Sequence, residues 1–346
     1  MHQKIRIGFL GTPSLASRVL ADLIADPHFE VVFVVTNPDK PIGRSGELQP
    51  TPVKKLALEH HITVYTPTKI RDNIDFFGQL SNHNCDYFIV VAYGRILPKE
   101  ILDMPKKMCI NVHGSILPKY RWASPIQAAL LHGEKETGVT IMKMSEGMDE
   151  GDILKIREIP INPLETSETL FEKFAQVSWP TLIMALDELE HGGITSLPQD
   201  HSQATYCTKI EKEDGLIDWS KSSEEIYHMW QAYTPWPGIF AVYEGKRLIL
   251  EQVKSEEWRV KNTEKILSFR HREEWSDLAS GNQGQDCFVP RSDKKEWQVT
   301  KLEDGTIGII CREWILTLEQ VKLEWKKSQN IKDFVNGNQN FIWCSF

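Results

Sequence analysis

The chain has 346 residues, 41% of them hydrophobic, and a formal net charge of −8. This length allows two domains of ordinary size, and the acidic balance argues against non-specific nucleic-acid binding, because a phosphate backbone attracts a basic surface. The amino terminus carries no signal-peptide pattern and no apolar run approaches the roughly 18 residues of a membrane helix, so we expect a soluble protein. The six isolated cysteines fit a reducing cytoplasm.

The first half of the chain predicts alternating strands and helices. Residues 4–10 alternate like a strand, and Thr12 and Pro13 then fit an N-cap and a first helical residue. Apolar residues at helical spacing follow, and residues 31–35 form a continuous apolar run typical of a strand covered on both faces. Further strands are predicted at 88–92 and 108–112. This order predicts a Rossmann-like, doubly wound parallel sheet over residues 1–190.

The two glycines at the first strand-to-helix turn are a weak signal. Gly8-Phe-Leu-Gly11 is not the full G-x-G-x-x-G dinucleotide fingerprint. We interpret it as an ordinary tight turn, which weakens the alternative of a nicotinamide-dependent oxidoreductase.

Residues 191–207 are rich in turn-forming residues and predict a linker, with a second domain over residues 208–346. Ser222 and Glu225 form a capping-box pattern that starts a helix. Short strands are predicted at 240–243, 247–253, 297–300, 306–311 and 315–321. They favour a small antiparallel, OB-like β-barrel. Residues 254–295 are highly charged and are interpreted as a long loop.

Asn111 and His113 are the most informative polar residues of the first half. They lie two apart on an otherwise apolar strand and therefore share one face, close to its carboxyl end. Open α/β sheets bind ligands at that end of their strands. A hydrogen-bonded polar pair at a solvated strand end is the structural alternative.

A turn with two glycines and four carboxylates, residues 145–152, follows another predicted strand at 137–144. It could be a solvated turn. A carboxylate that reached back to His113 would instead hold the imidazole in one tautomer and raise its basicity.

These motifs together resemble the folate-dependent formyltransferase family. The resemblance is carried by Asn111-Val-His-Gly-Ser-Ile-Leu-Pro118, Pro125-Ile-Gln and Gly147-Met-Asp-Glu-Gly-Asp152, and it resumes at Tyr233-Thr-Pro-Trp-Pro-Gly238. It implies 10-formyltetrahydrofolate as the donor of a formyl group and an amine as the acceptor. It also implies catalytic roles for Asn111, His113 and Asp149, and contacts to the folate from Ser115, Ile116, Leu117 and Pro118.

The implied chemistry explains these residue types. An amine attacks the formyl carbon, and an Asn111 N–H can donate to the resulting oxyanion, a contact typically worth about 3 kcal/mol. His113, acting as base or acid and steadied by Asp149, would add roughly 10²–10⁴-fold. No metal is needed, and the six cysteines are scattered singly without a zinc-like spacing.

The acceptor is predicted from a Pro- and Gly-rich loop at residues 37–55. It resembles the loop with which members that formylate initiator methionyl-tRNA contact the acceptor stem, and this implies tRNA-binding roles for Arg44, Lys40 and Lys54. The second domain is expected to contact the same tRNA, and the chain to be a monomer. The closest alternative is a sugar-nucleotide N-formyltransferase that uses the same donor. A non-catalytic RNA- or dinucleotide-binding protein is a more distant one.

Two features depart from the family pattern. Trp122 stands where the family has glycine, in Arg121-Trp122-Ala123-Ser124-Pro125, and so puts the shape of the pocket in question. Residues 256–301 look expanded relative to the usual barrel.

Overall fold

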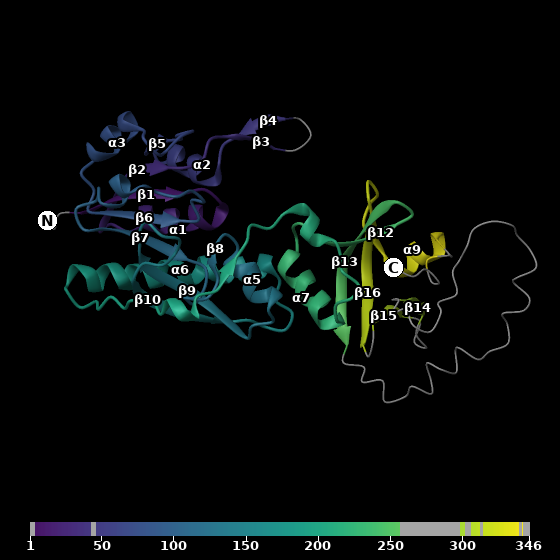
Figure 1. The fold of residues 1–346 in the computed structure, drawn as a ribbon. Coiled ribbons are helices and arrows are strands. Elements are labelled where there is room, and N and C mark those ends of the chain that lie inside the picture. The colour runs from purple at the N-terminus through teal and green to yellow at the C-terminus, as the bar shows by residue number, and fades with distance from the viewer. Residues whose placement is uncertain are drawn as a thin grey trace, which may run out of the picture. The chain divides into compact units, whose positions relative to one another are not determined.

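The protein is described by a computed structural model that covers residues 4–42, 46–256, 298–301, 306–311, 314–338 and 341 (Figure 1). The chain divides into two compact units. One comprises residues 1–130 and 134–210, and the other residues 131–133 and 211–346. The predicted loop at 254–295 lies almost entirely outside the described residues.

A seven-stranded sheet forms the centre of the first unit, in the order β10-β9-β7-β6-β1-β2-β5. Its strands are β1 (Ile5–Gly11), β2 (Phe29–Val35), β5 (Thr63–Tyr65), β6 (Tyr87–Val91), β7 (Met108–His113), β9 (Glu136–Lys143) and β10 (Ile153–Pro160). The strands from β7 to β5 pair in parallel, as predicted, whereas β9 runs antiparallel to both of its neighbours. The sheet is therefore mixed rather than wholly parallel.

Both faces of this sheet are buried, which explains the continuous apolar runs. Leu10, Phe33 and Phe88 point to one face and pack with residues from α3 and α4, whereas Phe9, Val34 and Ile89 point to the other. The first-unit helices are α1 (Ser14–Ala25), α2 (Pro52–Glu59), α3 (Ile74–Ser81), α4 (Lys99–Leu102), α5 (Pro125–Leu131) and α6 (Ser167–Glu190). Along α1, Val19 and Leu23 are buried at the predicted helical spacing.

The first strand-to-helix turn is a packing feature, as interpreted from the sequence. A Cβ on Gly8 would lie 2.4 Å from the Phe33 ring, and one on Gly11 would lie 2.9 Å from the Val91 carbonyl oxygen. The predicted Thr12 cap is wrong by one residue: Pro13 occupies the N-cap of α1, and no side chain caps the helix. The Thr12 hydroxyl instead accepts a hydrogen bond from Asn37 Nδ2 at 3.0 Å.

The segment predicted as a linker returns to the first unit after α6. It contains a 3-10 turn, η1 (His201–Gln203), and the short strand β11 (Tyr206–Cys207). β11 pairs in parallel with β8 (Arg121–Trp122), and the contact boundary between the units falls after Ile210. The segment from Gln199 to Cys207 is thus part of the unit that carries the catalytic candidates.

The second unit contains an antiparallel sheet in the order β12-β13-β16-β15-β14, with β17 paired to β16. Its elements are η2 (Lys212–Gly215), α7 (Ser223–Tyr233), β12 (Ile239–Tyr243), β13 (Lys246–Glu256), β14 (Gln298–Lys301), β15 (Ile307–Cys311), β16 (Trp314–Leu323), β17 (Gln329–Asn330) and α9 (Ile331–Gly337). The predicted capping box is confirmed, since Ser222 caps α7 and the Glu225 carboxylate accepts from the Ser222 backbone N–H. Strand direction throughout agrees with the predicted antiparallel domain.

Candidate active site

Strand β7 brings Asn111 and His113 to one face of the sheet. It lies between β6, which is parallel to it, and β9, which is antiparallel. Both polar side chains are buried, with relative exposures of 8% for Asn111 and 5% for His113. Two buried polar groups so close together require hydrogen-bonding partners, because burying them unpaired would be costly.

Asp149 supplies one of these partners from the loop between β9 and β10. Its Oδ1 accepts from Asn111 Nδ2 at 3.2 Å, and its Oδ2 lies 3.6 Å from His113 Nδ1. The structure therefore brings together the three residues that the sequence singled out, although 38 positions separate Asn111 from Asp149. Asp149 adopts φ +50°, a left-handed conformation that Asp tolerates better than most residues.

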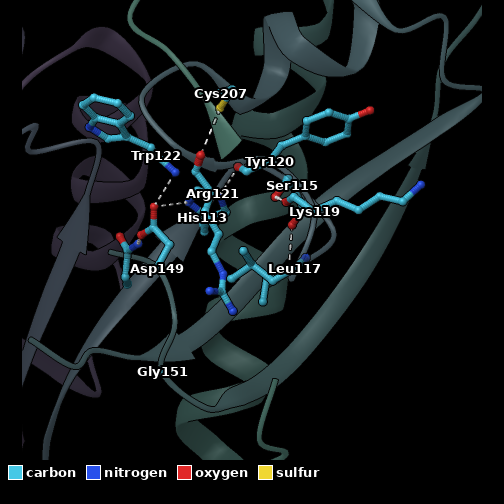
Figure 2. A network of polar contacts seen from close by, with 12 residues as sticks. His113, Ser115, Leu117, Lys119, Tyr120, Arg121, Trp122, Asp149, Gly151 and Cys207 are labelled. Carbon is cyan, nitrogen blue, oxygen red and sulfur yellow. Dashed lines mark hydrogen bonds and ion pairs between the residues drawn. The ribbon is translucent and has the colours of Figure 1, made fainter. Parts of the chain in front are cut away.

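The second imidazole nitrogen of His113 also has a partner, one that the sequence did not indicate. Nε2 lies 3.0 Å from the backbone carbonyl oxygen of Tyr120 (Figure 2). A carbonyl can only accept a hydrogen bond, so Nε2 must carry the proton. In the neutral ring, Nδ1 is then the basic nitrogen, and it faces Asp149.

Trp122 contacts the site through its backbone. Its backbone N–H donates to Asp149 Oδ2 at 2.8 Å, so this oxygen faces both Trp122 and His113. The residue has φ +87°, and its indole is 49% exposed. In Figure 2 the indole and the turn around Ser115 lie on opposite sides of His113.

The turn predicted to contact folate is held by side chains beneath it. The Ser115 hydroxyl donates to the Lys119 carbonyl at 2.6 Å, and Thr140 Oγ1 bridges the Ser115 carbonyl and the Leu117 N–H. Ser115 and Leu117 are themselves buried, at 0% and 3% exposure. Of the four predicted residues, Ile116 and Pro118 are the ones whose side chains are partly exposed.

The predicted tRNA-contacting loop is two elements rather than one. Strands β3 (Lys40–Ile42) and β4 (Glu47–Gln49) form a hairpin, and α2 then begins at Pro52 with Thr51 as its N-cap. Lys40 is exposed in the hairpin. Lys54 lies on α2 and pairs with Asp39 at 2.7 Å, so its charge is locally compensated. Arg44 lies outside the described residues.

Among the residues that the structure describes, no group of three or more His, Cys, Asp or Glu side chains could hold a metal ion. No helix among those same residues is both long and apolar enough to cross a membrane.

Two family models match this chain. Residues 4–186 match the model of the formyl transferase family, and residues 209–339 match the model of the formyl transferase C-terminal domain. The chain is 39% identical to the methionyl-tRNA formyltransferase of Pseudoalteromonas translucida over 99% of its length and 97% of the relative's. It is 48% identical to that of Desulfotalea psychrophila over 72% of this chain and 76% of the relative.

Solved structures share the fold at much lower identity. WlaRD, a sugar 3N-formyl transferase, matches with a TM-score of 0.60 and 16% identity, over 94% of this chain and all of its own. HypX from Aquifex aeolicus, solved with tetrahydrofolic acid, matches with a TM-score of 0.56 and 17% identity, over 96% of this chain and 47% of HypX. With both family models matched and near-full-length relatives above 30% identity, this chain belongs to the formyl transferase family.

Proposed function

We propose that this chain transfers the formyl group of 10-formyltetrahydrofolate to the α-amino group of methionyl-tRNA. The observation that carries this proposal is the 39% identity to a methionyl-tRNA formyltransferase across 99% of the chain. The grouping of Asn111, His113 and Asp149 supports it, because this arrangement has the donors and the base that the reaction needs.

In the proposed reaction, the amine nitrogen forms a bond to the formyl carbon and the bond from that carbon to N10 of the folate breaks. Negative charge develops on the formyl oxygen in between. An amide has two N–H groups, so Asn111 can donate to Asp149 and to this oxygen at the same time. A buried donor fixed in place by a carboxylate needs no reorganisation as the charge forms.

The same reaction moves a proton from the attacking amine to N10 of the leaving folate. α-Amino groups titrate at about 8, so a useful fraction of the acceptor is neutral near pH 7. His113 Nδ1 is the basic nitrogen, because Tyr120 holds the proton on Nε2. The nearby Asp149 carboxylate stabilises the imidazolium that forms when Nδ1 takes up the amine proton.

The donor is proposed to bind along the turn from Ser115 to Pro118. Thr140 and the buried Ser115 hydroxyl hold this turn, and such preorganisation lowers the entropic cost of binding. Ile116 and Pro118 would supply apolar contact to the folate, while Ser115 and Leu117 would act by holding the turn.

The acceptor is proposed to bind through the β3–β4 hairpin, with Lys40 and Arg44 contacting phosphates. In a chain of net charge −8, such contacts must be local. Lys54 would contribute less than these two, because Asp39 already neutralises it.

A sugar-nucleotide acceptor is the second candidate, and WlaRD supports it through fold alone. The decisive experiment offers the enzyme 10-formyltetrahydrofolate together with either charged initiator tRNA or a sugar nucleotide that carries its amine at C3 or C4. Formylation of methionyl-tRNA is the expected result. Transfer to the sugar amine with none to methionyl-tRNA would overturn the proposal.

A further inference from the structure

Gln199 is buried beside the loop that carries Asp149, and it lies in the segment that follows α6. Its side chain is 6% exposed. The amide Nε2 donates two hydrogen bonds, one to the Asp149 carbonyl at 2.9 Å and one to the Gly151 carbonyl at 2.7 Å. Both hydrogens of the amide are therefore committed to the backbone of the loop that carries Asp149.

The oxygen of the same amide is held by a buried arginine. Arg121 is 1% exposed and donates to Gln199 Oε1 from Nε at 3.2 Å and from Nη2 at 2.7 Å. A guanidinium can only donate, so it fixes the amide with its oxygen towards Arg121 and its nitrogen towards the loop. Figure 2 shows Arg121 extending from β8 in the direction of the loop at Gly151.

The backbone of the loop that carries Asp149 is strained at one residue and tightly packed at another. Asp149 has φ +50°, which costs free energy for a residue with a Cβ. Gly151 is packed so tightly that a Cβ there would lie 1.9 Å from the Lys143 carbonyl oxygen. A small displacement of this backbone would change both contacts of the Asp149 carboxylate, to Asn111 at 3.2 Å and to His113 at 3.6 Å.

We infer that Gln199, oriented by Arg121, is a positioning residue for Asp149: it fixes the loop backbone so that the carboxylate faces Asn111 and His113. The inference rests on the proposed formyl transfer. Gln199 does not touch the reacting atoms, so its effect must pass through Asp149. Misplacement of a catalytic group by about 1 Å can cost 10²-fold in rate, so the loss should appear in kcat rather than in either KM.

The test is a double-mutant cycle on Gln199 and Asp149. Gln199→Glu keeps an acceptor for Arg121 but turns a carboxylate oxygen towards two carbonyls. Gln199→Leu removes both donors, and thermal melts report whether each variant folds. Gln203→Glu is the matched control, because it makes the same chemical change four residues away at an exposed site.

We expect Gln199→Glu to lower kcat by roughly 10- to 100-fold, with both KM values within about twofold of wild type. In an Asp149→Ala background the same substitution should change kcat by less than about twofold, because the group it positions is gone. An equal loss in both backgrounds, or kcat near wild type in a folded Gln199→Glu enzyme, would overturn the inference. Failure of the wild-type enzyme to formylate methionyl-tRNA would instead overturn the proposed function.

Discussion

Trp122 combines a left-handed backbone with a side chain that is half exposed, and this combination predicts an unusual order of stability among its variants. At φ +87° a Cβ is strained, and such conformations cost about 1–3 kcal/mol. Trp122→Gly relieves this strain but adds about 0.5–1 kcal/mol of unfolded-state entropy. Trp122→Ala keeps the strain, and both variants lose the same indole contacts.

The difference between the two variants therefore isolates the backbone. With the strain at about 2 kcal/mol, the middle of its range, and the entropy at about 0.5–1 kcal/mol, glycine should be more stable than alanine at this position by about 1–1.5 kcal/mol. For a unit of about 200 residues this corresponds to a Tm about 2–6 °C higher. At an ordinary helical position the order is reversed, with alanine favoured by about 1 kcal/mol.

Thermal and urea unfolding monitored by circular dichroism would measure this difference. Met184 provides the matched control, because it has the same 49% exposure within α6, and Met184→Ala should be more stable than Met184→Gly. A Trp122→Ala variant as stable as Trp122→Gly would refute the strain argument.

Three other predictions concern the reaction, the acceptor and the core. Asn111→Ala and His113→Ala should each lower kcat by about 10² or more while each variant still unfolds in one cooperative thermal transition; near-normal turnover of His113→Ala would contradict the assigned base. Arg44→Ala should raise the KM for methionyl-tRNA and flatten its salt dependence without changing the KM for folate, and unchanged tRNA kinetics across a salt series would argue against the hairpin contact. Burial raises the pKa of the Cys85 thiol to about 12. The folded state then retains a proton that the unfolded chain releases above about pH 8.5, so the free energy of unfolding should fall as the pH rises beyond that value. Cys85→Ala should lessen this fall. An equal fall in the variant would show that burial does not raise the pKa of this thiol.

Sequence pattern predicted five of the seven strands of the first unit's sheet, β1, β2, β6, β7 and β9, and the polar pair on β7. Alternation along 108–113 placed Asn111 and His113 on one face because strand geometry has a period of two. Pattern could not show that β9 runs antiparallel, because strand direction depends on how the chain returns to the sheet rather than on residue type. The position of Thr12 was misjudged for a related reason: its hydroxyl bonds to Asn37, a partner 25 residues away.

Local sequence patterns could not identify the residues that support the site. Tyr120 acts through a backbone carbonyl, which is the same in every amino acid and leaves no signature in the sequence. Gln199 lies in a turn-rich stretch that predicts a linker, and its role depends on Arg121, 78 positions earlier. The sequence implied a tRNA contact for Lys54 but could not show that its Nζ lies 2.7 Å from Asp39 Oδ2.

Labelled formyl groups from 10-formyltetrahydrofolate show most directly whether this enzyme formylates methionyl-tRNA. Charged initiator tRNA is compared with uncharged tRNA and with a sugar nucleotide that carries its amine at C3 or C4, under the same conditions. Label is expected only on methionyl-tRNA, at the α-amino group, with transfer reduced at least about 10²-fold in Asp149→Ala. Label on the sugar nucleotide alone would contradict the proposed acceptor, and undiminished transfer by Asp149→Ala would contradict the proposed role of Asp149.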